Sequence, residues 1–157
     1  MEVTLRGLEA GDLDTLSGLL ERTGVFRPEE IGVAREVLEA ALKPGQTDYS
    51  VRVAECGGEV AGYAAWGETP CTRGTFDLYW IATHPSCQGK GVGRRLMEEA
   101  ERDMRERGGR LCLIETSSLP QYEPTRRFYL GLGYEEAAVL KDFYMPGDHK
   151  VIYMGRL

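Results

Sequence analysis

Residues 81–109 read IATHPSCQGKGVGRRLMEEAERDMRERGG, and the stretch changes character twice along its length. It starts at the end of an apolar run, continues through glycines at alternate positions, and ends in a long charged segment. From Val92 to Met104 an apolar side chain recurs every four residues, which places these side chains on one face of a helix. The stretch therefore predicts a buried strand over residues 75–83, a glycine-rich turn, and an amphipathic helix over residues 92–107 that two glycines end.

The glycine-rich turn has the composition of an anion-binding loop. Gly89, Gly91 and Gly93 carry no side chain that would cover the backbone, so their N–H groups can converge on a bound group. The N-terminus of the following helix adds partial positive charge. Full positive charges stand in or beside the turn on Lys90, Arg94 and Arg95. A diphosphate is the group that this combination favours.

Two common phosphate-binding motifs do not match the turn. A P-loop requires a lysine followed by serine or threonine, whereas Lys90 is followed by Gly91. The dinucleotide-binding fingerprint requires G-x-G-x-x-G, whereas this turn reads G-x-G-x-G and then two arginines. A plain glycine-rich surface turn at the start of a helix is the alternative interpretation.

The rest of the chain alternates between strand and helix patterns, without repeats or low-complexity tracts. Helical patterns begin at Asp12, which we interpret as an N-cap, at Pro28 and at Pro124. Strands are expected at residues 2–6, in a hairpin that turns at residues 56–59, and at residues 110–116, 134–144 and 150–157. The expected order is β, α, α, β, β, β, α, β, α, β, β, a mixed sheet with helices on its faces.

Composition limits the classes of protein to which the chain can belong. At 157 residues and 42% hydrophobic content, it is expected to form one domain over residues 1–157. No run approaches the ~20 apolar residues of a membrane span, and the N-terminus lacks a signal-peptide pattern. The four cysteines have neither metal-ligand nor disulfide-scaffold spacing. We therefore expect a cytoplasmic protein with reduced thiols and no membrane partner, and the net charge of −6 argues against a nucleic-acid partner.

Two segments resemble the GCN5-related N-acetyltransferase (GNAT) family. QGKGVG at residues 88–93 resembles the family's Q/R-x-x-G-x-G/A pyrophosphate loop, and FYLGLGY at residues 128–134 is similar to its F-Y-x-x-x-G-F segment. The element order agrees over the whole chain. The resemblance implies the acyl-CoA N-acyltransferase fold, an α/β fold with a mixed central sheet flanked by helices. In this fold two central parallel strands separate, and pantetheine pairs along one of them.

The resemblance also implies which residues hold acetyl-CoA as the cosubstrate. Backbone groups of Ile81, Ala82 and Thr83 would contact pantetheine and the thioester. The diphosphate would lie on the loop of Gln88, Gly89, Lys90, Gly91, Val92, Gly93 and Arg94. No metal is expected, because His84 and His149 each stand alone in the sequence.

Tyr129 and Glu115 are the expected catalytic residues. Tyr129 falls at the tyrosine that protonates the departing CoA thiolate in many members, and a phenol with a pKa of about 10 keeps its proton at neutral pH. Packing on the sheet is its alternative role. Glu115 falls near a glutamate that serves some members as the general base, and a solvated or paired carboxylate is its alternative role.

The segment before Tyr129 departs from the family pattern. Many members have asparagine seven residues before the tyrosine, where this chain has Tyr122 in a segment about two residues longer. The departure loosens the alignment of Glu115. Asp77 and Tyr79 on the preceding strand could instead relay a proton through water.

We expect an N-acetyltransferase in which a primary amine of a small molecule or a protein attacks the thioester directly. The cleft for a cationic acceptor could be lined by Glu29, Glu30, Asp77 and Glu123 and by the segment of residues 141–150. An acidic surface that serves only solubility is the alternative. An amino acid, a polyamine, an aminoglycoside-like antibiotic and a protein N-terminus stay open as acceptors, and a homodimer stays open as the assembly. The alternatives are a non-catalytic acyl-CoA sensor, and a chain that uses the same fold for another acyl donor or for interaction only.

Overall fold

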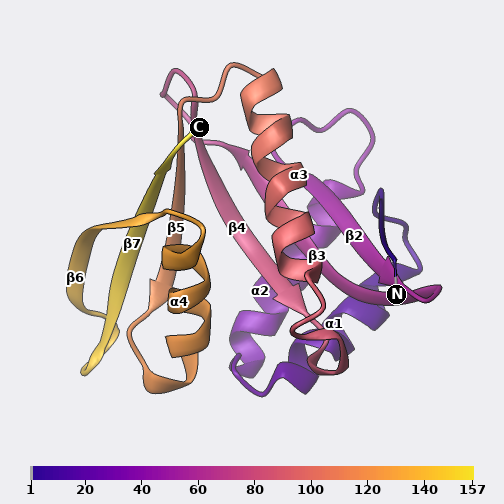
Figure 1. Ribbon diagram of the computed structural model, residues 1–157, viewed down its shortest axis with the longest axis horizontal. Helices are drawn as coiled ribbons and strands as arrows, with labels where there is room; N and C mark the ends of the chain where they lie inside the picture. The colour runs from indigo at the N-terminus through magenta and orange to yellow at the C-terminus, as the bar shows by residue number, and fades with distance from the viewer. Residues whose placement is uncertain (1) are drawn as a thin grey trace. The chain divides into compact units, whose positions relative to one another are not determined.

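The computed structural model describes residues 2–157, whose strands hydrogen-bond in the order β1-β2-β3-β4-β5-β7-β6 (Figure 1). The strands are β1 Val3–Arg6, β2 Ser50–Cys56, β3 Glu59–Glu68, β4 Thr75–Thr83, β5 Leu111–Ser117, β6 Glu135–Met145 and β7 Asp148–Arg156. The helices are α1 Asp12–Thr23, α2 Pro28–Ala41, α3 Val92–Glu106 and α4 Glu123–Gly131, with short 3₁₀ turns η1 Pro85–Cys87 and η2 Pro120–Tyr122. The predicted element order is confirmed, and only the ends of elements shift.

The chain forms two compact units. The first comprises residues 2–67 and 79–103, and the second comprises residues 68–78 and 104–157. Strand β4 and helix α3 each contribute residues to both units. One functional domain over residues 1–157 stays a prediction. None of the helices in the described part of the chain is both long and apolar enough to cross a membrane.

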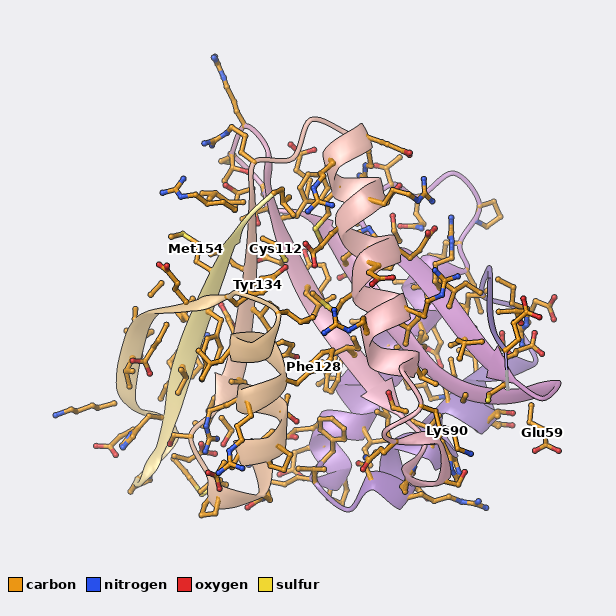
Figure 2. The ribbon with its side chains drawn as sticks, in the orientation of Figure 1. Glu59, Lys90, Cys112, Phe128, Tyr134 and Met154 are labelled. Atoms are coloured by element: carbon orange, nitrogen blue, oxygen red, sulfur yellow. The ribbon has the colours of Figure 1, made fainter. Side chains whose placement is uncertain are left out.

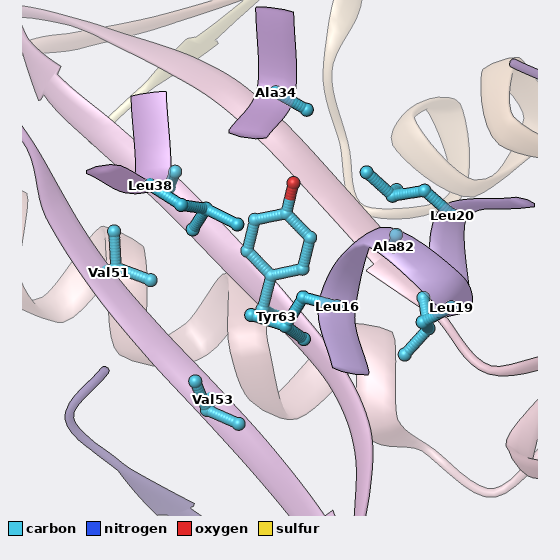
Figure 3. Close-up of a cluster of buried hydrophobic side chains, with 10 residues drawn as sticks. Leu16, Leu19, Leu20, Ala34, Leu38, Val51, Val53, Tyr63 and Ala82 are labelled. Atoms are coloured by element: carbon cyan, nitrogen blue, oxygen red, sulfur yellow. The ribbon is translucent and has the colours of Figure 1, made fainter. Parts of the chain in front are cut away.

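In the first unit, α1 and α2 cover one face of β2 and β3. Alternate residues of a strand point to the same face, so Val51 and Val53 of β2 meet the helices together. The ring of Tyr63 stands at the centre of this cluster (Figure 3). The helices contribute Leu16, Leu19, Leu20, Ala34 and Leu38, all of them buried. Leu16, Leu19 and Leu20 thus form the buried face of α1, and the partly buried Leu13 packs against the same cluster.

The other face of β3 packs on α3. The buried indole of Trp66 donates its Nε1–H to an Asp103 carboxylate oxygen at 2.8 Å, which fixes the helix against the strand. Gly62 permits the approach at the other end of the strand. A Cβ there would lie 2.5 Å from the Ala82 carbonyl oxygen and 3.2 Å from Val92 Cγ1. Position 62 therefore admits no side chain without movement of β4.

Asp12 does not cap α1 as the sequence predicted. Gly11 occupies the N-cap, and Asp12 is the first helical residue. Its buried carboxylate accepts hydrogen bonds from both terminal nitrogens of Arg6, at 2.8 and 2.9 Å, and one from the Glu9 N–H. The bonds from Arg6 hold the pKa of Asp12 below its usual value. The Asp12 carboxylate therefore links α1 to Arg6 of β1, and it does not act as the N-cap of its own helix.

In the second unit, β5 is the central strand. It pairs in parallel with β4 from Thr75↔Leu111 to Leu78↔Ile114, and the family resemblance implies such a parallel pair at the centre of the sheet. It pairs antiparallel with β7, which in turn pairs with the edge strand β6. Helix α4 covers one face, where Tyr129 contacts the rings of Tyr134 and Tyr153.

Candidate functional site

The glycine-rich turn begins where β4 ends. The His84 N–H donates to the Ala61 carbonyl at 2.7 Å, and the His84 Nδ1 accepts the Ser86 N–H at 3.1 Å. These bonds end the strand and start η1, which leads the chain into residues 88–91 and then into α3. The strand, turn and helix predicted from residues 75–107 are confirmed.

Two glycines of the turn require the left-handed backbone region. Gly89 has φ +77° and Gly91 has φ +82°, whereas Gly93 lies in the first turn of α3. A Cβ at Gly89 or Gly91 would meet nothing within 4 Å. The glycines are therefore needed for backbone conformation, and the space over the loop is open.

The N–H groups of this turn are available to a ligand. In the described part of the chain, the backbone N–H groups of residues 89–94 donate no hydrogen bond to the protein. The helix ladder begins only with the bond from the Arg95 N–H to the Gly91 carbonyl, at 3.0 Å. A row of free N–H groups at a helix N-terminus, where the helix dipole is positive, suits an anion.

Charged side chains accompany these N–H groups. Lys90 extends from the turn beside the start of α3 (Figure 2), and Lys90 and Arg94 are exposed. Among residues 2–157, neither of them forms an ion pair, whereas Arg95 has Glu98 at 4.0 Å. Lys90 and Arg94 can therefore contact a phosphate without breaking an ion pair within the protein.

The residues expected to contact pantetheine are the last three of β4. Ala82 is buried, and its methyl group belongs to the core under α1 and α2. Ile81 and Thr83 are half-buried. A contact through Ala82 would therefore use its backbone groups, as the family resemblance implies.

Tyr129 lies in the second unit on α4, with only 4% of its surface exposed. Its ring contacts Phe128, Tyr134 and Tyr153. Burial raises the pKa of Tyr129 well above its ordinary value, so the phenol keeps its proton at neutral pH. Within residues 2–157, no hydrogen bond to the hydroxyl is present. A hydroxyl that is protonated and forms no hydrogen bond to the described residues has the state that a general acid needs. The ring also packs on its neighbours, as the alternative role of Tyr129 expects.

Glu115 is paired, and the sequence did not indicate its partner. The Lys150 ammonium of β7 lies 2.9 Å from Glu115 Oε2 and 3.7 Å from the centroid of the Phe143 ring. Register places Lys150 opposite Ser117, so Glu115 lies two residues away on the same face of the sheet. The position of β7 beside β5 could not be read from the sequence. The expectation that residues 141–150 could line the acceptor cleft therefore included Lys150 and Phe143 but not their contacts with Glu115 and with each other.

Asp77 shares this face of the second unit. Its Oδ2 accepts a hydrogen bond from the Thr69 hydroxyl at 2.7 Å. Burial raises the pKa of Asp77, the Thr69 bond opposes that rise, and the charge of Glu115 adds to it. Asp77 is thus a second carboxyl group on this face, and its pKa lies above that of an exposed aspartate.

The longer segment before Tyr129 forms η2. The Arg126 Nη1 holds it by donating to the carbonyls of Ser117 and Leu119, at 2.7 and 2.9 Å. Tyr122 ends this turn. The segment between β5 and α4 is therefore an ordered turn.

Residues 81–94 thus lie together in the first unit, and Asp77, Glu115 and Tyr129 lie in the second. Residues 47–136, which contain all of these, match a family model described as an acetyltransferase (GNAT) domain. The chain belongs to the GNAT family. Strand β7 and its Lys150 lie outside the matched range.

Known structures agree with this membership in the GNAT family. A GNAT-family protein from Desulfovibrio desulfuricans is 43% identical, with a TM-score of 0.93 and 99% of each chain covered. A Salmonella typhimurium protein, whose structure holds its cofactor acetyl-CoA, is 22% identical, with a TM-score of 0.76. That likeness covers all of this chain and 95% of the other, and it shows the fold alone.

A curated relative matches a shorter part of this GNAT chain. The tRNA uridine(34) acetyltransferase of Methanocaldococcus jannaschii is 33% identical over 78 residues. The match covers 50% of this chain and 12% of the relative. The two proteins therefore share one segment, which is a small part of the larger protein.

Proposed function

We propose that this GNAT protein transfers the acetyl group of acetyl-CoA to a primary amine of a small molecule or a protein. The observation that carries the proposal is the row of free N–H groups over residues 89–94, at the N-terminus of α3. Lys90 and Arg94 add positive charge beside it. This arrangement supports binding of the diphosphate of CoA.

The reaction begins with a neutral amine. Its nitrogen attacks the thioester carbonyl carbon, and the backbone of Ile81–Thr83 is proposed to hold the thioester in place. The C–S bond then breaks, and its electron pair leaves on the sulfur. Tyr129 donates its proton to that thiolate, which gives free CoA thiol, and the nitrogen loses one proton to give the neutral amide.

The surroundings of Tyr129 keep its phenol protonated, which is the form that an acid needs before the C–S bond breaks. A phenol that keeps its proton at neutral pH can give it to a thiolate only as negative charge develops on sulfur. The surrounding rings of Phe128, Tyr134 and Tyr153 fix the phenol ring, so little motion is lost in the transition state.

Glu115 is proposed to take the proton of the amine. Its carboxylate stands 52% exposed on one side, and the Lys150 ammonium compensates its charge on the other. Asp77, on the same face, is the second candidate for this proton, directly or through water.

The test is CoA thiol release from acetyl-CoA with a panel of amines, followed by mass spectrometry of the product. The proposal expects release that depends on one class of amine and a product heavier by one acetyl group. Tight CoA binding without release for every amine would instead favour the acyl-CoA sensor. The absence of CoA binding would favour a chain that uses the fold for another acyl donor or for interaction.

A further inference from the structure

Two consecutive residues of β3, Ala61 and Gly62, contact both ends of the glycine-rich turn. The Ala61 carbonyl accepts the His84 N–H at 2.7 Å, which holds the chain where it leaves β4. A Cβ at Gly62 would lie 2.5 Å from the Ala82 carbonyl oxygen and 3.2 Å from Val92 Cγ1. The end of β4 and the first residue of α3 therefore meet at one point of β3.

These two segments are the ones that acetyl-CoA would occupy together. The backbone of Ile81–Thr83 is proposed to hold the thioester, and the N–H groups of residues 89–94 are proposed to hold the diphosphate. A ligand with two linked groups binds with its full affinity only if both groups reach their sites at once. The distance between the two segments therefore matters to acetyl-CoA as much as the groups on each segment do.

A side chain at position 62 would change that distance. A carbon atom and a carbonyl oxygen in contact normally lie about 3.3–3.6 Å apart, so a methyl group there requires a shift of about 0.8 Å or more from Ala82. The obstructing atom belongs to the backbone, so rotation of a side chain cannot relieve the contact. A shift of the whole of α3 would break the 2.8 Å bond from Trp66 to Asp103 in the last turn of the helix. The shift therefore falls on the end of β4 and the first turn of α3.

We propose that Gly62 is a positioning residue of the acetyl-CoA site. Its missing side chain lets the end of β4 and the start of α3 approach each other on β3. That approach sets the distance between the groups that hold the thioester and the groups that hold the diphosphate. This inference rests on the proposed function, because it gives Gly62 a part in binding the same cosubstrate. Gly62 acts through Ala82 and Val92 and is assigned no contact with the ligand.

Gly62→Ala adds one methyl group, and two ligands report its effect. Acetyl-CoA spans both segments, whereas 3′-phospho-ADP, the nucleotide half of CoA, has the diphosphate without the pantetheine arm. Isothermal titration calorimetry should show that the variant binds acetyl-CoA about tenfold more weakly or worse and binds 3′-phospho-ADP within about threefold of the natural chain. With saturating acetyl-CoA, kcat should also fall about tenfold or more, because the thioester is displaced from the attacking amine.

Gly67→Ala is the matched control. Gly67 is a buried glycine of the same strand, and a Cβ there would meet the Asp48 carbonyl oxygen, which is again a backbone atom. It lies five residues from Gly62, or about 17 Å along the strand. Gly67→Ala should therefore destabilise the protein by a comparable amount and leave both affinities unchanged.

Val92→Ala tests the same contact from the side of α3. Val92 is 1% exposed, and its shortening removes the group nearest to position 62 without adding an atom to β3. The first turn of α3 then loses its support, and the affinity for acetyl-CoA should fall about threefold or more while that for 3′-phospho-ADP stays within about twofold. This variant keeps the test decisive if Gly62→Ala does not fold, which thermal melts establish.

The natural chain separates failure of this inference from failure of the proposed function. A natural chain that binds no acetyl-CoA would overturn both. A natural chain that binds acetyl-CoA, with folded variants that keep its affinity, would overturn this inference alone. Equal losses for the two ligands would overturn it as well, because the loop itself would then be disturbed. So would a nucleotide half that does not bind the natural chain, because the affinity would then not be divided between two segments.

Discussion

The Lys150 ammonium lies 2.9 Å from Glu115 Oε2, and only 12% of the Lys150 side chain is exposed. The Phe143 ring lies on the same ammonium, with its centroid 3.7 Å away. A cation between a carboxylate and an aromatic ring is held more firmly than one in an exposed ion pair. The negative charge of Glu115 is therefore already compensated by Lys150 before any acceptor amine arrives.

Lys150→Met should lower the KM for a cationic amine acceptor by about three- to tenfold. The substitution keeps most of the side chain and removes a positive charge that repels the incoming ammonium. Two unit charges about 4 Å apart in water interact by about 1 kcal/mol, which corresponds to about fivefold in binding. Steady-state kinetics at two salt concentrations provide the measurement, and the decrease in KM should be smaller at high salt.

Lys150→Arg is the control, because it keeps the charge and should keep the KM within about twofold. An equal fall in KM for an uncharged, poorly basic amine would show that charge repulsion is not the cause. A Lys150→Met variant with an unchanged KM for every acceptor would likewise show that Lys150 does not repel the acceptor.

Asp77→Asn should stabilise the protein at neutral pH and not in acid. The pKa of Asp77 is raised mainly by burial, which penalises the ionised form in the folded protein. Stability therefore falls as pH rises through this raised pKa, and the penalty is absent below the ordinary value of about 3.9. Asparagine does not ionise, and its amide oxygen can still accept the Thr69 hydrogen bond. We expect a Tm higher by up to about 2 °C at neutral pH, with the difference vanishing in acid.

Asp48→Asn, at an exposed aspartate, is the comparison for this effect. Thermal melts from acid to neutral pH should show no pH-dependent gain for it. A gain for Asp77→Asn that is the same at every pH would mean that burial of the charge is not responsible.

The sequence predicted the elements whose patterns are local. The four-residue spacing from Val92 to Met104 and the glycines before it were sufficient for α3 and its turn. The error at Asp12 arose because its carboxylate bonds to Arg6 of β1, a partner that no local helix rule takes into account. The contact of Lys150 with Glu115 follows from the register of β7 on β5. That register depends on the whole sheet, so local patterns in the sequence do not indicate it. The conformation of one segment, such as the turn before α3, was predictable from local patterns, and contacts between strands, such as that of Lys150 with Glu115, were not.

Gly91→Val should weaken acetyl-CoA binding well over tenfold. Residue 91 has φ +82°, where a β-branched side chain is strained, so the turn must change conformation and its N–H groups must turn away from the diphosphate. Isothermal titration calorimetry with CoA gives the affinity directly. Gly45→Val is the matched control, because Gly45 has φ +77° in another open turn of the same unit. Gly45→Val should lower the free energy of unfolding by a similar amount and leave the CoA affinity unchanged. Equal CoA affinities for the two variants would contradict the proposal that the loop at Gly91 binds the diphosphate.

Replacing Arg94 and Arg95 by glutamine should flatten the salt dependence of CoA affinity. Both side chains are exposed, and contacts of exposed charges with phosphates are screened over about 8–10 Å at physiological ionic strength. Affinities measured across a salt series should therefore fall less steeply for the variant than for the natural chain. Arg22→Gln with Lys43→Gln removes the same charge from exposed positions elsewhere and should leave the slope as it was. An unchanged slope in the Arg94 and Arg95 variant would show that other residues hold the phosphates.

Tyr129→Phe should lower kcat by about 100-fold or more, the usual effect of removing a positioned acid. It should change acetyl-CoA affinity by less than a few-fold, because the hydroxyl is proposed to act only as the C–S bond breaks. The substitution keeps the ring and its contacts with Phe128, Tyr134 and Tyr153. The hydroxyl accepts no hydrogen bond within residues 2–157, so its loss leaves no partner unsatisfied, and the Tm should stay close to that of the natural chain.

Steady-state rates alone do not distinguish a packing role from a slow step outside the chemistry. If Tyr129→Phe retains full turnover at saturating amine, single-turnover rates decide between the two, because they isolate the acetyl transfer. An unchanged single-turnover rate would remove Tyr129 from the mechanism. A parallel collapse of turnover, CoA affinity and Tm would assign it to packing. Only a slower transfer step in a protein with natural affinity and Tm supports the acid, since the proton is then needed in the transition state and nowhere else.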